Sequence, residues 1–326
     1  SSPHIRAKDD TRSAMLDVMI ALLPALAFAV FNFGLRALTL TAVSVAGAVA
    51  FEALYRLIMK KHQTVGDLSA AVTGMLVAFI CPVTAPYWMI LIGDFFAIVI
   101  VKQLYGGLGQ NFVNPALAAR AFLFSWATQM STWAAPGTQA ALFGAVDVTT
   151  QATPMSYLST NSLADLQAVY GLDNMFVGTI GGSLGEVSAV CLLLGFLYLL
   201  CRKVVSWDIP VSFVGTVALL TFLFPRGNDP LTWMLYNVLG GGLLLGAIFM
   251  ATDYVTSPIS RRNRIIYGIG CGLITVFIRY FGSYSEGVCY SILCMNLCVW
   301  LLDKYLKPRR FGAARKPLFR RKEAEE

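Results

Sequence analysis

Long apolar runs separated by short polar segments make up most of the chain. A bilayer-crossing helix needs about 20 mainly apolar residues, and ten runs approach that length. The runs cover residues 15–33, 37–58, 68–82, 87–101, 113–130, 185–201, 209–224, 231–252, 265–281 and 288–303. This pattern predicts an all-α polytopic membrane protein with about ten transmembrane helices.

Composition supports this fold class and excludes several others. Of the 326 residues, 57% are hydrophobic and only 13% are charged, whereas soluble domains have about 25% charged residues. A disordered chain, a nucleic-acid-binding domain and an ordinary soluble enzyme are therefore excluded. No metal site is predicted, because His4 and His62 have no neighbours at ligand spacing. The seven cysteines form no C-x-x-C pair and fall in or beside apolar runs, as small buried hydrophobes do.

Lysine and arginine are distributed unevenly among the polar segments. With the N-terminus in the cytoplasm, 21 of the 25 Lys and Arg residues fall on the cytoplasmic side. Because cytoplasmic loops of membrane proteins carry an excess of these residues, this orientation is favoured over its inverse. Nine of the cations lie in the tail from residue 304, which we expect to face lipid, a partner or solvent.

The stretch from Ala121 to Cys201 contains no Lys, Arg or His, and it includes the longest polar segment, Ser131 to Phe176. A segment without cations is not retained inside, so we place it on the outer face, periplasmic in a cell with two membranes. The expected parts are a cytoplasmic N-terminus (1–14), a first membrane half (15–130), an outer loop (131–184), a second membrane half (185–303) and a basic cytoplasmic tail (304–326).

The two membrane halves resemble each other. Gly74–Pro86 aligns with Gly246–Pro258, and both segments end in Val-Thr-x-Pro. Ile98–Lys102 likewise resembles Thr275–Arg279. With five crossings in each half, the second copy runs in the opposite direction, as in inverted-topology repeats with broken or re-entrant helices near the midplane. Chance similarity between apolar segments is the alternative.

The densest motif is Gly106-Gly-Leu-Gly-Gln-Asn-Phe-Val-Asn-Pro-Ala116. Asn114 followed by Pro115 is typical of an N-cap with Pro at the first helical position. The amides of Asn111 and Asn114 offer donors and acceptors, which suit a planar ligand with several carbonyls and ring nitrogens. A capped re-entrant turn without a ligand is the alternative.

Acidic residues inside apolar runs are costly, and Asp94 and Asp253 are two such residues. We expect them to mark a path for a cation or a proton. Three glutamates nearer the run ends are expected to snorkel or to form structural ion pairs, with Arg120 and Arg279 as candidate partners. These glutamates are Glu52, Glu186 and Glu286.

Asp147-Val-Thr-Thr-Gln-Ala-Thr153 in the outer loop resembles the flavin-attachment motif of the RnfD/NqrB family, although Gln151 stands where Gly or Ser is commoner. Taken alone, this segment would be interpreted as a flexible polar loop. The short N-terminus is more similar to the D subunit of the Rnf (Rsx) complex than to the longer B subunit of the sodium-pumping quinone reductase. The resemblance extends to Ser1–Arg6, Gly107–Ala116, Gly182–Glu186 and Ala251–Pro258.

The resemblance implies that a flavin transferase esterifies Thr153 with the phosphate of FMN on the outer side. It also implies a noncovalent riboflavin, with Asn111 and Asn114 as its contacts. A family member of this kind lies in the cell inner membrane within a complex that exchanges electrons between ferredoxin and NAD. The chain would pass electrons between partner subunits, coupled to Na⁺ or H⁺ movement.

Two other functions stay open at this stage. A solute transporter or channel could be built on the same inverted repeat, and a structural anchor for partner subunits would need no cofactor. NAD itself is not expected to bind, because the chain has no nicotinamide fingerprint.

Overall fold

The computed structural model describes residues 10–142, 149–160, 163–227, 229–282 and 287–307. Within these ranges every regular element is a helix, apart from one isolated antiparallel bridge between Ala134 and Thr150. The prediction of an all-α protein is therefore confirmed. Asp147, Glu286, residues 1–9 and the tail from residue 308 lie outside the described residues.

Four helices are long and apolar enough to cross a bilayer: α1 (Thr11–Phe33), α2 (Leu35–Ile58), α14 (Arg261–Phe281) and α15 (Val288–Tyr305). A fifth span is possible by length if α12 (Pro230–Leu239) is joined to the segment Leu243–Met250, from which it is bent by 59°. The described residues therefore contain four or five candidate spans, as fits a multi-pass membrane protein.

A single residue, Gly34, separates α1 from α2. Its φ of 81° lies in the left-handed region, which glycine adopts without the steric cost of a Cβ atom. A Cβ atom there would also overlap the side-chain oxygen of Gln139. The first two long helices can therefore reverse direction without a loop.

Several of the apolar runs hold short or irregular helices. After the 3₁₀ turn η1 (Val65–Asp67), run 68–82 contains α3 (Ser69–Phe79), which at about 1.5 Å per residue covers roughly half of a ~30 Å hydrocarbon core. The remaining short elements are α4 (Tyr87–Phe95), which continues into the π-helix η2 (Phe96–Gln103), α5 (Pro115–Leu123), η3 (Phe124–Trp126), α6 (Ala127–Met130), α10 (Ala189–Cys201) and α11 (Asp208–Leu223).

Run 231–252 is not one straight helix. It contains α12, then α13 (Leu243–Leu245) and the π-helix η4 (Gly246–Met250). The break falls at Gly241 and Gly242, whose φ values of 66° and 64° cannot continue a right-handed helix. The glycines therefore turn a predicted crossing into a bent pair of helices.

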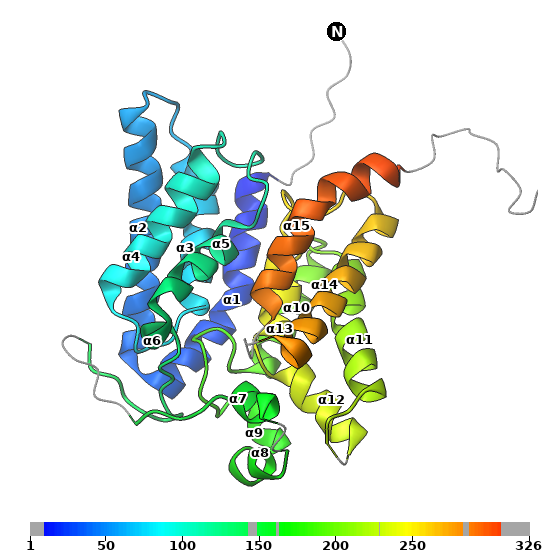
Figure 1. Ribbon diagram of the computed structural model, residues 1–326. Coiled ribbons are helices and arrows are strands. Elements are labelled where there is room, and N and C mark those ends of the chain that lie inside the picture. Colours follow the sequence, from blue (N-terminus) through cyan, green and yellow to red (C-terminus); the bar gives the residue numbers. More distant parts are fainter. Residues whose placement is uncertain (1–9, 143–148, 161–162, 228, 283–286, 308–326) are drawn as a thin grey trace, which may run out of the picture.

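The helices form two groups that lie side by side (Figure 1). In the first group α2 packs against α3 and α4, and in the second α11 packs against α12 and α14. The groups meet where α1 packs along α10 and where α5 packs along α15. The buried apolar core is continuous across this junction.

The outer region predicted for residues 131–184 is folded. It contains α7 (Pro154–Ser159), α8 (Leu163–Val169) and α9 (Leu172–Val177), at the end of the molecule opposite to the start of α1 and the end of α15 (Figure 1). Apolar side chains such as Met155 and Leu166 are buried there, and Tyr236 of α12 donates a hydrogen bond of 2.6 Å to the Tyr170 carbonyl. Within the motif that begins at Asp147, the described residues 149–153 form no helix, and α7 begins directly after them.

Candidate functional site

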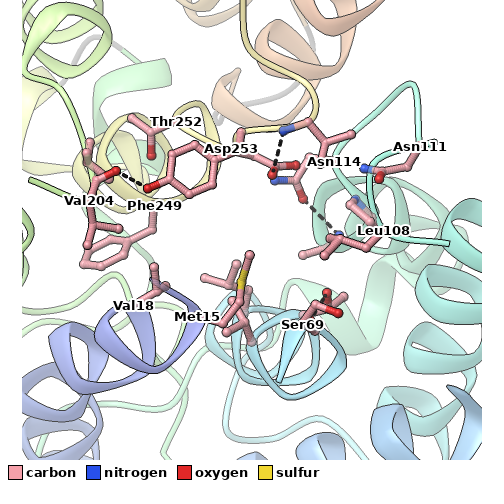
Figure 2. A pocket seen from close by; sticks show the side chains of 18 of the residues that line it. Met15, Val18, Ser69, Leu108, Asn111, Asn114, Val204, Phe249, Thr252 and Asp253 are labelled. Carbon is pink, nitrogen blue, oxygen red and sulfur yellow. Dashed lines mark hydrogen bonds between the residues drawn. The ribbon is translucent and has the colours of Figure 1, made fainter. Parts of the chain in front are cut away.

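A cavity of about 80 Å³ lies at the junction of the two helix groups (Figure 2). The empty space around it, counted together with open solvent, is about 760 Å³. Met15 and Val18 of α1 face Asn114 and Asp253 across the space. The wall thus combines α1 and α3 with the glycine-rich segment before α5 and the residues that follow η4.

Asn114 is positioned by the start of α5. Its Oδ1 caps the helix by accepting hydrogen bonds from the backbone N–H groups of Ala116 (3.0 Å) and Leu117 (3.3 Å). Its Nδ2 donates to the carbonyl of Met250, the last residue of η4, at 3.1 Å. The predicted N-cap is therefore confirmed, and the same side chain joins two short helices from opposite halves of the chain.

Asn111 also lies in the cavity wall and is 6% exposed. Its Nδ2 donates to the Val113 carbonyl at 3.1 Å, which leaves its Oδ1 without a partner among the described residues. The preceding loop depends on glycine: Gly107 has a φ of 101°, and a Cβ atom there would lie 2.6 Å from a guanidinium nitrogen of Arg56. The motif thus brings one amide with spare hydrogen-bonding capacity to the cavity.

The two acids singled out in the sequence lie in different places. Asp253 is in the cavity wall, where its carboxylate accepts from the Val255 N–H (3.3 Å) and the Thr256 hydroxyl (3.2 Å). Asp94 in α4 is fully buried within the first helix group. Its Oδ1 lies 2.9 Å from the Ser44 hydroxyl, and its Oδ2 has no partner among the described residues.

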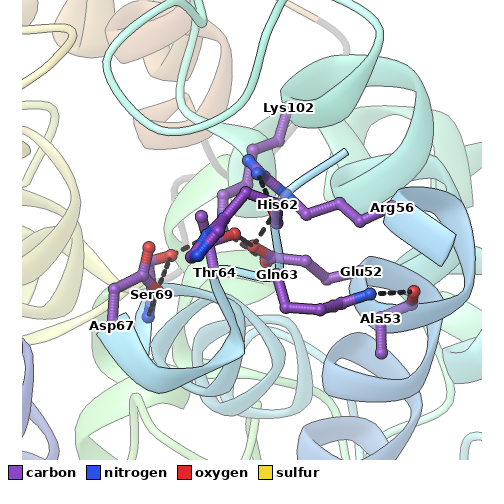
Figure 3. Close-up of polar contacts among 9 residues, drawn as sticks. All are labelled: Glu52, Ala53, Arg56, His62, Gln63, Thr64, Asp67, Ser69 and Lys102. Carbon is purple, nitrogen blue, oxygen red and sulfur yellow. Dashed lines mark hydrogen bonds and ion pairs between the residues drawn. The ribbon is translucent and has the colours of Figure 1, made fainter. Parts of the chain in front are cut away.

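Sequence reasoning missed one residue of the cavity wall. Lys102 of η2 is 2% exposed and donates hydrogen bonds to Glu52 (2.8 Å) and to the hydroxyl of Ser69 (2.6 Å), as Figure 3 shows. From the sequence, Lys102 counted only as a cation on the cytoplasmic side. The sequence does contain a signal for this ion pair, since Lys102 directly follows the apolar residues Phe96–Val101 and Glu52 lies within another apolar run.

The two arginines proposed as ion-pair partners, Arg120 and Arg279, have different contacts. Arg120 of α5 binds Glu186 at 2.6 Å, with both side chains largely buried. Arg279 donates to backbone carbonyls at the bend after α12, those of Asn237 (2.6 Å) and Gly240 (3.2 Å), and Glu286 lies outside the described residues. The ion-pair expectation is therefore confirmed for Glu186, with Arg120 as its partner.

Thr153 is not among the residues that line the cavity. It lies at the N-terminal boundary of α7. It is 7% exposed, and its hydroxyl makes no hydrogen bond within the described part of the chain. The backbone before it is held firmly: Gln151 N–H donates to the Trp133 carbonyl (3.1 Å), and the Tyr170 hydroxyl donates to the Ala152 carbonyl (2.9 Å). Burial raises the pKa of Tyr170 to about 12, which keeps this donor neutral.

The cavity and Thr153 therefore belong to different parts of the molecule. Asn111, Asn114 and Asp253 come together in one wall, whereas α7 lies at the opposite end from the loop before α5 (Figure 1). Among the described residues, no three His, Cys, Asp or Glu side chains group as metal ligands would.

Comparison with known proteins decides the family. Residues 1–312 match the NQR2, RnfD, RnfE family. The chain belongs to this family. The resemblance noted from the motifs is thereby confirmed over nearly the whole length of this NQR2, RnfD, RnfE family member.

Curated relatives within the family are subunits of ion-translocating complexes. The D subunit of the Na⁺-translocating ferredoxin:NAD⁺ oxidoreductase complex of Acetobacterium woodii is 47% identical over 317 residues, 97% of this chain and 95% of that protein. The D subunit of the proton-translocating ferredoxin:NAD⁺ oxidoreductase complex of Clostridium ljungdahlii is 41% identical, covering 97% and 96%. The D subunit of the ion-translocating oxidoreductase complex of Stutzerimonas stutzeri is 42% identical, covering 93% of each chain.

Proposed function

We propose that this chain is the flavin-bearing membrane subunit of an ion-translocating electron transport complex of the ferredoxin:NAD type. The uncommitted hydroxyl of Thr153, within a motif that resembles a flavin-attachment sequence, carries the proposal. Other subunits of the complex are its redox partners. The chain holds no complete activity alone, because the donor and acceptor sites belong to those partners.

Thr153 is the proposed attachment residue for FMN. A phosphoester consumes the threonine hydroxyl, and no hydrogen bond within the described residues competes for it. Trp133 and Tyr170 hold the backbone just before Thr153, so an attached group keeps a defined position. Because Thr153 is 7% exposed, we expect the flavin transferase to act before this region packs onto α12.

Riboflavin is the proposed ligand of the cavity. The spare Oδ1 of Asn111 suits the N–H of a flavin ring, and the apolar walls from Met15, Val18 and Phe249 suit its flat faces. Asn114 holds the wall together through α5 and η4, and its second Nδ2 hydrogen remains for a ring carbonyl. A bound flavin supplies one- or two-electron chemistry that no side chain here offers.

Ten crossings in two inverted five-helix repeats are the proposed topology. Each of the ten predicted runs contains a helix, and the proposed partners α1 and α10, and α5 and α15, contact each other as elements related by a central axis do. The aligned cations support the same pairing. Lys102 contacts Ser69 at the start of α3, and Arg279 contacts the Gly241 carbonyl (3.5 Å) just before α13.

The proposed location is the cell inner membrane, with both termini cytoplasmic and the Thr153 region periplasmic. The end of α2, which carries Arg56, and the start of α14, which carries Arg261, lie near the end where α1 begins (Figure 1). Arg202 pairs there with Asp17 of α1 at 3.2 Å. The cation-free α7–α9 region lies at the opposite end. This separation fits the positive-inside rule.

Asp94 and Asp253 remain the proposed markers of an ion path, with Na⁺ or H⁺ as the coupling ion. Asp253 borders the flavin cavity and Asp94 lies within the first helix group. An acid with an unpaired oxygen at such depth is costly, which is the reason for assigning it a function.

Mass spectrometry of the Thr153 peptide from active complex tests the proposal. We expect the mass of an FMN phosphoester on that peptide and in-gel flavin fluorescence, both lost in Thr153→Ala. The matched control Thr149→Ala removes a hydroxyl at a variable position of the motif and should retain the fluorescence. An unmodified Thr153 peptide in active complex from a host that has the transferase would overturn the assignment.

A further inference from the structure

A buried ammonium group forms part of the cavity wall. Lys102 is 2% exposed, yet it lines the cavity together with Ser69, Asn111 and Asp253. A lone buried cation is costly, so its surroundings must compensate its charge. The groups that bind the ammonium determine which of its N–H donors remain for a ligand.

Two carboxylates offset the charge of Lys102, Glu52 directly and Asp67 through the hydroxyl of Ser69 (Figure 3). Glu52, which is fully buried, accepts its direct hydrogen bond at 2.8 Å. The Ser69 hydroxyl accepts the second hydrogen bond of Lys102 at 2.6 Å and donates its own hydrogen bond to Asp67, also at 2.6 Å. Because that hydroxyl hydrogen is committed to Asp67, Lys102 is the donor to both partners, and its contact with Glu52 is an ion pair.

Glu52 is itself fixed by further partners. Its other oxygen accepts from the Thr64 hydroxyl at 2.5 Å and lies 3.9 Å from Nε of Arg56. Arg56 in turn donates to the His62 carbonyl at 2.7 Å. Glu52, the counter-ion of Lys102, is therefore held in a fixed position.

An ammonium group has three N–H donors, and Glu52 and Ser69 use two of them. The third has no partner among the described residues. A ligand in the cavity can accept it, and because Lys102 is 2% exposed, water screens its charge only weakly. Asp253, the carboxylate in the cavity wall, accepts hydrogen bonds from Val255 and Thr256, and within the described residues no hydrogen bond joins it to Lys102.

We propose that Lys102 contacts the ligand of this cavity and stabilises the negative charge that the ligand gains on reduction, with Glu52 as a positioning residue that offsets part of this effect. The inference rests on the proposed flavin site. Electrons added to a neutral flavin ring leave it negative unless protons follow, so a fixed cation favours the reduced form. Lys102 and Glu52 therefore act on the midpoint potential with opposite signs.

The test uses the full chain in detergent with Thr153→Ala, so that a noncovalent flavin is the only chromophore. Spectroelectrochemistry measures its midpoint potential. In Lys102→Met we expect at least a tenfold loss of affinity for the reduced over the oxidised form, which lowers a one-electron potential by about 59 mV. Glu52→Gln should raise the potential, and the exposed cation control Lys61→Met should leave it unchanged.

A retained flavin whose potential does not change in Lys102→Met overturns the inference and leaves the proposed flavin site intact. So does a shift in the same direction for Lys102→Met and Glu52→Gln. If Lys102→Met does not fold, the double variant Lys102→Met/Glu52→Gln removes both members of the Lys102–Glu52 pair together and must still lower the potential. Absence of noncovalent flavin from the parent chain overturns both the flavin site and this inference.

Discussion

At the scale of single residues, buried polar side chains act as connections between elements that lie far apart in the chain. Asn114 links α5 to η4, Lys102 links η2 to α2 and α3, and Arg120 links α5 to Glu186. Each of these side chains is almost fully buried, so loss of one partner leaves the other without that hydrogen bond and without water to replace it. These positions should respond most strongly to substitution.

The Arg120–Glu186 pair gives one such prediction. Arg120→Met leaves the buried Glu186 carboxylate without its cation, which typically costs about 3–5 kcal/mol. We expect a clearly lower melting temperature of the detergent-solubilised protein. Lys61→Met is the control, because Lys61 is exposed and forms no ion pair within the described residues, so its loss should cost at most about 1 kcal/mol. Equal melting temperatures for the two variants would contradict the prediction.

Tyr170 gives a prediction in the outer region. Burial raises its pKa to about 12, above the value of about 10 of an unfolded tyrosine, so its contribution is complete below pH 10 and is lost as the pH rises through 12. Tyr170→Phe removes the hydrogen bond to Ala152 and should cost about 1 kcal/mol. Proteolysis between residues 149 and 153 should accelerate in the variant at neutral pH. Unchanged cleavage would show that this bond does not hold the segment.

At the scale of elements, short helices and glycine bends create the cavity. α3 and α5 are too short to cross a bilayer alone, and their ends, together with the end of η4, leave room between the two groups. The bend at Gly241 and Gly242 allows α13 and η4 to turn away from α12 by 59°. An uninterrupted helix over residues 231–252 would not supply this wall.

Gly242→Ala tests the bend. A Cβ atom there would overlap the Glu186 carboxylate, and the φ of 64° adds about 1–2 kcal/mol of strain for a residue other than glycine. We expect a lower melting temperature and reduced flavin retention. Gly215→Ala is the matched control in α11, where no heavy atom lies within 4 Å of the added Cβ and alanine should stabilise the helix by about 0.5–1 kcal/mol. A neutral Gly242→Ala would mean that the bend does not depend on glycine.

At the scale of the whole molecule, the two ends carry different chemistry. Within the described part of the chain, most Lys and Arg residues and the loop before α5 lie at the end where α1 begins, and the region around Thr153 lies at the other. The proposed function therefore separates two flavins along the membrane normal. Such a separation requires that the two ends face different compartments.

Cysteine labelling tests that orientation. In a variant without the native cysteines, Gln167→Cys should react with an impermeant maleimide in right-side-out vesicles, because residue 167 in α8 is exposed within the outer region. Lys60→Cys, exposed at the other end, should react only after permeabilisation. The reverse labelling pattern would invert the proposed orientation and place Thr153 in the cytoplasm.

The sequence by itself determined the all-helical membrane class and the N-cap at Asn114. It also singled out the glycine-rich motif around Asn111 and the motif at Thr153 that resembles a flavin-attachment sequence. Apolar run length, cap chemistry and charge distribution depend on neighbouring residues in the chain, so they can be recognised without coordinates. Only the tertiary structure decided that Asp253 lies opposite α1 in one cavity with Asn111 and that Lys102 joins them. Packing between distant helices sets such contacts, and the short helices and glycine bends create a cavity only when both groups are assembled.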